Sequence, residues 1–141
     1  KLLESILIGF ENKSNDKKII MKSSIQKNLI IEADEILFRN VVFNLLGNAL
    51  KFTPRNGTIA IEAIEEDNRV IVSIKDSGVG ISEEHMNKIF GEYSTMHTEG
   101  TDGEKGTGLG LGICKKIIDA HGFQITFESK VGEGTDFRIL I

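Results

Sequence analysis

Residues 35–52, EILFRNVVFNLLGNALKF, constrain the fold of this 141-residue chain more than any other segment. Apolar side chains occur on nearly all sides of the helix that this segment predicts, and such a helix is buried on most of its surface. Asp34 is a candidate N-cap, and Pro54 ends the helix because a proline disfavours helical geometry in the preceding Thr53. The rest of the chain must therefore supply the layers that cover this helix.

Strand-like alternation follows the helix. Residues 58–66 (TIAIEAIEE) and 69–76 (RVIVSIKD) are predicted to form an antiparallel pair joined by a turn at Asp67-Asn68. Further strands are predicted at 17–22, 29–33, 123–129 and 135–141, and further helices at 2–12, 82–90 (capped by Ser82) and 109–120, the last ending at Gly122. We therefore expect a single domain over residues 1–141, an α/β (α+β) two-layer sandwich with helices on a sheet of five or six strands.

Composition excludes several functional classes. The net charge of −4 argues against nucleic-acid binding, which needs a basic surface. No apolar run approaches the roughly 20 residues that span a bilayer, so we expect no direct membrane contact. The single cysteine, Cys114, lies in an apolar run and is expected in the core. Because residue 1 is Lys, we expect the chain to be a piece of a longer protein.

The predicted helix 35–52 also carries a polar stripe. Asn44, Asn48 and Lys51 recur at i, i+4 and i+7, which places them on one face. Amide oxygens suit a hard cation such as Mg²⁺, and a lysine suits a phosphate. On spacing alone, an ordinary solvated stripe on a surface helix is the favoured interpretation, and the neighbouring glycine clusters shift the balance.

Two glycine clusters, DSGVG (76–80) and GTGLGLG (106–112), suggest backbone that comes close to a ligand. Neither matches the P-loop or the GxGxxG pattern. The second cluster runs into a predicted helix, whose free N–H groups would favour an anion. Asp76 stands at a strand end, where its carboxylate could accept from an amino group such as that of adenine. Taken alone, however, Asp-Ser-Gly is also an ordinary turn sequence.

In this order, NLLGNALKFTP, DSGVGIS, KIF, GTGLGLGI and GEGTDF resemble the catalytic, ATP-binding domain of sensor histidine kinases of two-component systems. The resemblance covers essentially the whole chain. It implies the Bergerat ATP-binding fold of the GHKL superfamily, in which a mixed five-stranded sheet packs against three helices. Topoisomerase, mismatch-repair and heat-shock chaperone ATPases share this fold.

The resemblance also implies roles for individual residues. Asn48 would be the main magnesium ligand, assisted by Asn44, and Lys51 would contact phosphates, so that Asn48 and Lys51 carry the catalytic roles. Asp76 would accept from the adenine amino group. The other implied nucleotide-binding positions are Phe52, Gly78, Gly80, Ile81, Lys105, Gly106, Thr107, Gly108, Leu109, Gly110, Leu111 and Thr135.

Residues 91–107 would form the ATP lid. They depart from the family pattern in two ways. Gly91-Glu92-Tyr93 follows Phe90 where members of the family often have Glu-Pro-Phe, and Lys105 is the only cation of the lid and would have to replace an arginine. The packing of the lid is therefore the part of the site that the resemblance predicts least.

The function that the resemblance implies is to bind ATP with Mg²⁺ and to donate the γ-phosphoryl group to a histidine on a separate helical dimerisation domain. None of His85, His97 and His121 matches the acceptor pattern, so we expect the acceptor outside this chain. A response regulator would act downstream. The chain would be a cytoplasmic domain, and the sequence leaves open whether its parent is anchored in a membrane.

Two alternatives remain at this point. A related GHKL-type ATPase would activate water with a glutamate near the start of the asparagine helix, where Glu35 is the only acid and lies well before Asn48. A degenerate nucleotide-binding domain could instead serve as an interaction module.

Overall fold

The computed structural model describes residues 1–91, 99–104 and 110–141. Five predicted nucleotide-binding residues, Lys105, Gly106, Thr107, Gly108 and Leu109, lie outside the described residues, as does the lid segment 92–98. The elements in chain order are α1 (Leu2–Asp16), β1 (Ile20–Ile25), α2 (Glu35–Phe52), β2 (Thr58–Glu66), β3 (Arg69–Asp76), α3 (Glu83–Met86), α4 (Gly110–Ala120), β4 (Gln124–Lys130) and β5 (Gly134–Leu140).

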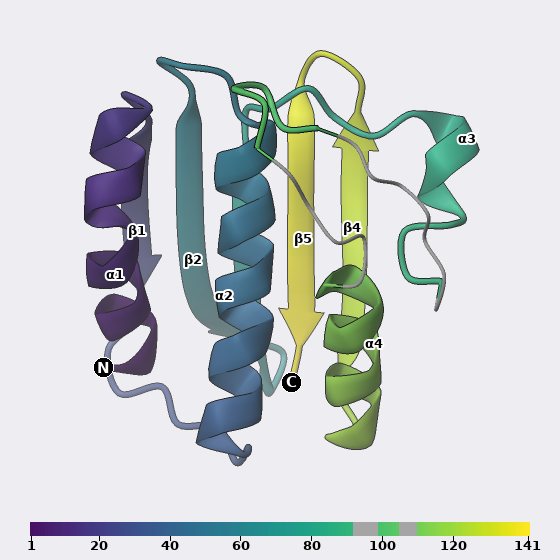
Figure 1. Cartoon of the computed structure of the whole chain (residues 1–141). Coiled ribbons are helices and arrows are strands. Elements are labelled where there is room, and N and C mark those ends of the chain that lie inside the picture. Colours follow the sequence, from purple (N-terminus) through teal and green to yellow (C-terminus); the bar gives the residue numbers. More distant parts are fainter. Residues whose placement is uncertain (92–98, 105–109) are drawn as a thin grey trace.

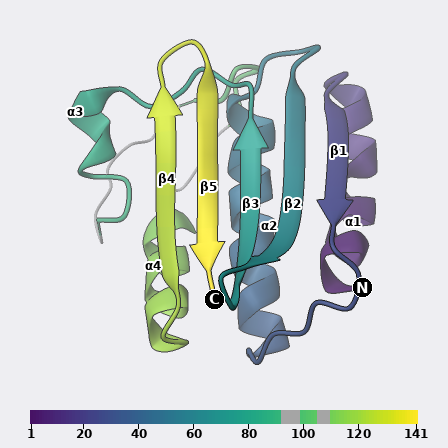
Figure 2. The same cartoon turned by 180° about the vertical axis from the view of Figure 1, so that it is seen from behind.

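The five strands form one mixed sheet in the order β1-β2-β3-β5-β4. Only the β1–β2 pair is parallel, and the other three pairs are antiparallel. Helices α1, α2 and α4 lie side by side on one face of the sheet, with α2 between the other two (Figure 1). The view from behind shows that these helices leave the other face uncovered (Figure 2). The predicted two-layer sandwich is confirmed.

Helix α2 provides the centre of the core. Its buried residues are Phe38, Val41, Val42, Leu45, Leu46 and Ala49, and they pack with alternate residues of the sheet such as Ile59, Ile61, Ile74 and Ile139. Burial of a side chain of this size stabilises the fold by about 1.5–3 kcal/mol. Ile36 and Phe43 are 72% and 50% exposed, so the apolar surface of α2 extends beyond the part that the other elements cover.

Local sequence signals place most element ends correctly. Asp34 caps α2, because its Oδ1 accepts from Leu37 N at 2.9 Å, and Thr53 is extended in front of Pro54. Asp67 and Asn68 have φ angles of 51° and 61°, the left-handed conformation of a tight hairpin turn. Gly122 follows α4 with φ +73°, as predicted for a glycine that ends a helix.

Three local predictions were wrong. Residues 29–33 form no strand, because after β1 they carry the chain to the start of α2 and pair with no other strand. Helix α1 continues to Asp16, so the strand predicted at 17–22 begins only at Ile20. The helix predicted at 82–90 is only α3, and Ser82 Oγ pairs with His85 Nδ1 at 2.8 Å instead of capping the backbone.

Candidate functional site

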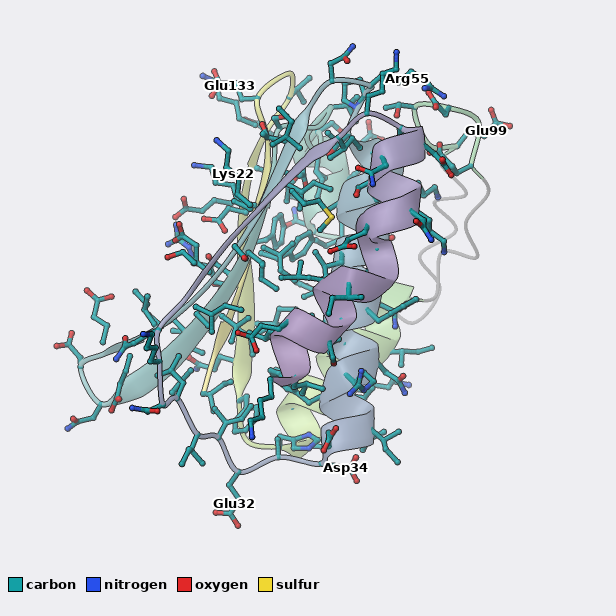
Figure 3. The ribbon with its side chains drawn as sticks, turned by 90° about the vertical axis from the view of Figure 1, so that its left-hand side faces the viewer. Lys22, Glu32, Asp34, Arg55, Glu99 and Glu133 are labelled. Carbon is teal, nitrogen blue, oxygen red and sulfur yellow. The ribbon has the colours of Figure 1, made fainter. Side chains whose placement is uncertain are left out.

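The sequence-predicted site residues within the described ranges lie on the C-terminal half of α2, at the start of α4 and on segments around the C-terminal end of α2. The loop after β3 reaches this end, since Val79 N donates to the Phe52 carbonyl at 3.1 Å, and the β4–β5 turn joins the loop through Gly132 N and the Val79 carbonyl at 2.9 Å. Figure 3 labels Arg55 and Glu133 at this end of the molecule and Asp34 at the opposite end. The site therefore combines segments that are far apart in the sequence.

Asp76 is the last residue of β3 and is only 7% exposed. Its Oδ1 accepts from Gly78 N at 2.8 Å and from Thr135 N at 3.3 Å. Burial raises the pKa of the Asp76 carboxyl to about 6, although these two backbone hydrogen bonds act to lower it. Neither of the two bonds involves Oδ2, and no residue within 1–91, 99–104 or 110–141 donates a hydrogen bond to this oxygen.

The glycines around Asp76 are required by the protein's own packing. A Cβ on Gly78 would stand 2.6 Å from both Asp76 Oδ1 and the Phe52 carbonyl oxygen. Gly80 has φ +72° and faces the Lys130 carbonyl, and Gly134 has φ +111° and faces the Asp76 carbonyl, each too closely for any side chain. DSGVG is thus held between the end of α2 and the β4–β5 hairpin.

The hydroxyl groups of Ser129 and Thr135 pair with each other on the β4–β5 side of this site. Ser129 Oγ accepts from Ile81 N at 2.8 Å and lies 2.8 Å from Thr135 Oγ1 and 3.1 Å from the Gly134 carbonyl. Thr135 is buried and was predicted at the nucleotide, whereas Ser129 was missed. No motif marks Ser129, because it occupies an ordinary alternating position of β4.

The polar stripe of α2 faces the start of α4. Asn44 donates through Nδ2 to the Asn40 carbonyl at 2.9 Å, and its amide oxygen accepts no hydrogen bond from the part of the chain that the structure describes. A Cβ on Gly110 would stand 3.1 Å from that oxygen. Asn48 is partly buried, and its carboxamide makes no hydrogen bond to the residues that the structure describes. Asn44 and Asn48, the two predicted magnesium ligands, therefore lie on one face of α2, and within the described residues no hydrogen bond uses their amide oxygens.

The amide oxygens of Asn44 and Asn48 are suitable ligands for Mg²⁺, which prefers oxygen ligands and commonly completes its coordination shell with water and substrate phosphates. Among residues 1–91, 99–104 and 110–141 no group of three or more His, Cys, Asp or Glu side chains could hold a metal ion. Because Asn44 and Asn48 are neutral, the negative charge to retain such an ion would have to come from a ligand such as a phosphate. The chemistry of this site therefore favours the metal together with a nucleotide over the metal alone.

Lys51 and Phe52 end α2 beside these amides. The Lys51 ammonium stands 4.7 Å from the centroid of the Phe52 ring. Burial lowers the pKa of Lys51, and the nearby Glu104 carboxylate partly offsets this effect. A cation that is partly desolvated in this way interacts more strongly with an incoming anion than one in open water.

Residues 99–104, in the middle of the predicted lid, contact the same end of α2. Glu104 Oε1 pairs with the buried Lys17 ammonium at 2.6 Å, and Thr101 N donates to the Lys51 carbonyl at 3.0 Å. The sequence analysis did not foresee these polar contacts. No local signal could have identified Lys17, which lies in a lysine pair predicted to begin a strand.

Comparisons with known proteins find related sequences and structures over most of this chain. Residues 33–141 match the family model described as histidine kinase-, DNA gyrase B- and HSP90-like ATPase. Sensor protein SrrB of Staphylococcus aureus (strain NCTC 8325 / PS 47) is 36% identical over 138 residues, which cover 98% of this chain but 24% of SrrB. The chain thus spans about a quarter of the length of this curated relative.

Solved structures extend the similarity to three dimensions. A nucleotide-free catalytic domain of histidine kinase ThkA superposes with a TM-score of 0.85 at 34% identity, covering 99% of this chain and 90% of that one. Full-length ShkA in complex with AMPPNP gives a TM-score of 0.81 at 29% identity, with 99% and 28% covered. ThkA in complex with response regulator TrrA gives 0.80 at 32% identity, with 99% and 39% covered. The chain therefore belongs to the family of histidine kinase-, DNA gyrase B- and HSP90-like ATPases and is homologous to the catalytic domains of sensor histidine kinases.

Proposed function

We propose that this domain binds ATP with Mg²⁺ and donates the γ-phosphoryl group to a histidine on a helical dimerisation domain of its parent protein. The observation that carries this proposal is the Asp76 carboxylate, which is buried at a strand end and held through Oδ1 by two backbone N–H groups. Its other oxygen can accept from the amino group of adenine. A response regulator would then receive the phosphoryl group, as the ThkA complex with TrrA suggests by homology.

In this mechanism the chain positions reactants and stabilises charge. The reaction breaks the bond between the γ-phosphorus and the oxygen that bridges to the β-phosphate, and it forms a bond from phosphorus to an imidazole nitrogen, leaving ADP. Magnesium, when bound, would neutralise charge on the phosphates, and Asn48 and Asn44 would hold it. Lys51 would contribute a second positive charge at the phosphates, and Asp76 would orient the adenine.

The geometry argues against a water-activating ATPase. Glu35 lies at the first turn of α2, is 73% exposed and pairs with Arg39 at 3.3 Å. At about 1.5 Å per residue, Glu35 stands about 20 Å along the helix from Asn48. A general base must come within hydrogen-bond reach of the water that it activates, so Glu35 does not suit this role.

The direct test is calorimetric titration of the 141-residue domain with ATP in the presence of magnesium and of a chelator. We expect binding that requires magnesium for its full affinity. The variant Asp76→Asn should bind ATP more weakly than the wild type. Its control is Asp67→Asn, the same substitution at an exposed position of the β2–β3 turn, which should bind ATP as the wild type does. A folded domain that does not bind ATP would favour the degenerate interaction module instead.

A second experiment tests the phosphoryl transfer. Incubated alone with γ-labelled ATP, the domain should stay unlabelled, because none of its three histidines matches the acceptor pattern. Adding the helical domain of the parent should give acid-labile phosphohistidine on that partner. Stable labelling of this domain alone, or phosphate release without the partner at an equal rate, would contradict the kinase proposal.

A further inference from the structure

Lys17 is a buried lysine that uses all three of its donors. It follows the last residue of α1 and is 5% exposed. Its ammonium donates to the Leu50 carbonyl at 2.8 Å, to the Lys51 carbonyl at 3.0 Å and to Glu104 Oε1 at 2.6 Å. A buried lysine is rare unless it is paired. The positive charge of Lys17 interacts favourably both with the negative, C-terminal end of the α2 dipole and with the Glu104 carboxylate.

The partner of Lys17 belongs to a short segment, residues 99–104, which we call the strap. Thr101 N donates to the Lys51 carbonyl at 3.0 Å, and Thr101 Oγ1 donates to the Thr53 carbonyl at 3.1 Å. Asp102 pairs with Arg55 at 3.0 Å. Figure 3 labels Arg55 and Glu99 at the same end of the molecule. The strap therefore lies across the C-terminal end of α2, where Lys51 and Phe52 stand.

The strap brings Glu104 into the surroundings of Lys51. A Cβ on Gly100 would stand 2.6 Å from Lys51 Cγ and would clash with the Glu104 carboxylate, so the two side chains meet at this glycine. Burial acts to raise the pKa of Glu104, but the hydrogen bond from Lys17, backbone N–H groups and the Lys17 charge lower it below its ordinary value. An ionised carboxylate thus sits near the lysine that would bind phosphate, and Lys17 compensates its charge.

We propose that Lys17 is a positioning residue for phosphate binding: it pairs with Glu104, fastens the strap to the end of α2 and so leaves the Lys51 ammonium free for the phosphates of the nucleotide. This inference rests on the proposed function, because it assigns the Lys51 ammonium to a phosphate. Without Lys17, the Glu104 carboxylate would turn to Lys51 and compete with the phosphates for its charge.

A double-mutant cycle tests the proposal by calorimetry with ATP and, separately, with adenosine, which has no phosphate. Lys17→Met should weaken ATP binding about tenfold, because the Glu104 carboxylate, which is only partly buried and would have lost its partner, would compete with the phosphates for Lys51. Glu104→Gln should bind ATP within about twofold of the wild type. Adding Glu104→Gln to Lys17→Met should restore most of the lost affinity, and adenosine should bind all four proteins alike.

Matched controls separate charge pairing from general damage. Lys13→Met removes an exposed lysine of α1, and Glu99→Gln removes an exposed carboxylate of the strap, so neither should change ATP affinity. Circular dichroism and urea unfolding report the fold of each variant. If Lys17→Met does not fold, Lys17→Gln takes its place, because it keeps a donor for the α2 carbonyls but no charge.

Equal losses in Lys17→Met and in the double variant, or equal losses for ATP and adenosine, would reduce Lys17 to a structural residue and overturn the proposal. Unchanged ATP affinity in Lys17→Met would do the same. Failure of the proposed function gives a different pattern: the wild type would not bind ATP, or Asp76→Asn would bind it as tightly as the wild type.

Discussion

Asp76→Asn should make the domain more stable at neutral pH while it weakens nucleotide binding. The pKa of Asp76 is about 6 in the folded protein against 3.8 for an ordinary carboxyl, with burial as the main cause. Between these two values the folded protein binds more protons than the unfolded chain, so the free energy of unfolding falls as the pH rises from about 4 to about 6. At about 1.4 kcal/mol per pKa unit, ionised Asp76 destabilises the fold at pH 7 by about 3 kcal/mol.

An asparagine keeps the acceptor oxygen for Gly78 N and Thr135 N but has no charge to desolvate. We therefore expect urea unfolding at pH 7 to show Asp76→Asn about 1–3 kcal/mol more stable than the wild type, the lower values arising because a buried amide also needs partners. At pH 3.5, where the wild-type carboxyl is protonated, the two stabilities should converge. Asp67→Asn, at an exposed turn, should show no such pH-dependent gain.

Nucleotide affinity should move in the opposite direction. The asparagine NH₂ group would face the adenine amino group, donor against donor, which costs about 1–3 kcal/mol, or about tenfold to a hundredfold in affinity. Because the ligand needs the ionised carboxylate, wild-type affinity should decline below pH 6, and the variant should lose this pH dependence. A variant less stable than the wild type at pH 7 would refute the argument from burial, and unchanged calorimetric affinity would refute the adenine assignment.

Three further predictions concern other residues. Asn48→Ala should stay folded, since alanine is a better helix former, but its ATP affinity should no longer depend on magnesium. The control Asn40→Ala, at an exposed position of the same helix, should keep the magnesium dependence. A magnesium dependence that survives in Asn48→Ala would exclude Asn48 as the ligand. Gly80→Ala should cost about 3 kcal/mol or more in urea unfolding, because its Cβ would strike the Lys130 carbonyl. Gly122→Ala, which has nearly the same φ but open space around its Cβ, should cost only about 1–2 kcal/mol, and equal costs would contradict the steric argument. Burial raises the pKa of the Cys114 thiol to about 12, so iodoacetamide should modify it only at the rate of unfolding, and rapid labelling of the folded domain would show that α4 opens locally.

Short sequence patterns of a few neighbouring residues were sufficient to predict many of the helices, turns and motifs of this protein. The apolar pattern of residues 35–52, with Asp34 before it and Pro54 after it, predicted α2 and both of its ends. Asp67-Asn68 predicted the β2–β3 turn for the same reason, because the turn conformation depends on the residues that adopt it. The order of the glycine and asparagine motifs also indicated the family, since each motif is a short contiguous segment.

Only the tertiary structure decided which distant segments meet. Residues 29–33 have strand-like composition, but a strand needs a partner, and none lies beside them. Lys17 in KKII resembles any solvated lysine until the end of α2 and Glu104 surround its ammonium. Ser129 and Gly134 likewise gain their importance from Ile81 and Asp76, each more than 45 residues away in the chain. Local patterns report what a segment can form, whereas burial and charge pairing depend on neighbours that only the folded chain brings together.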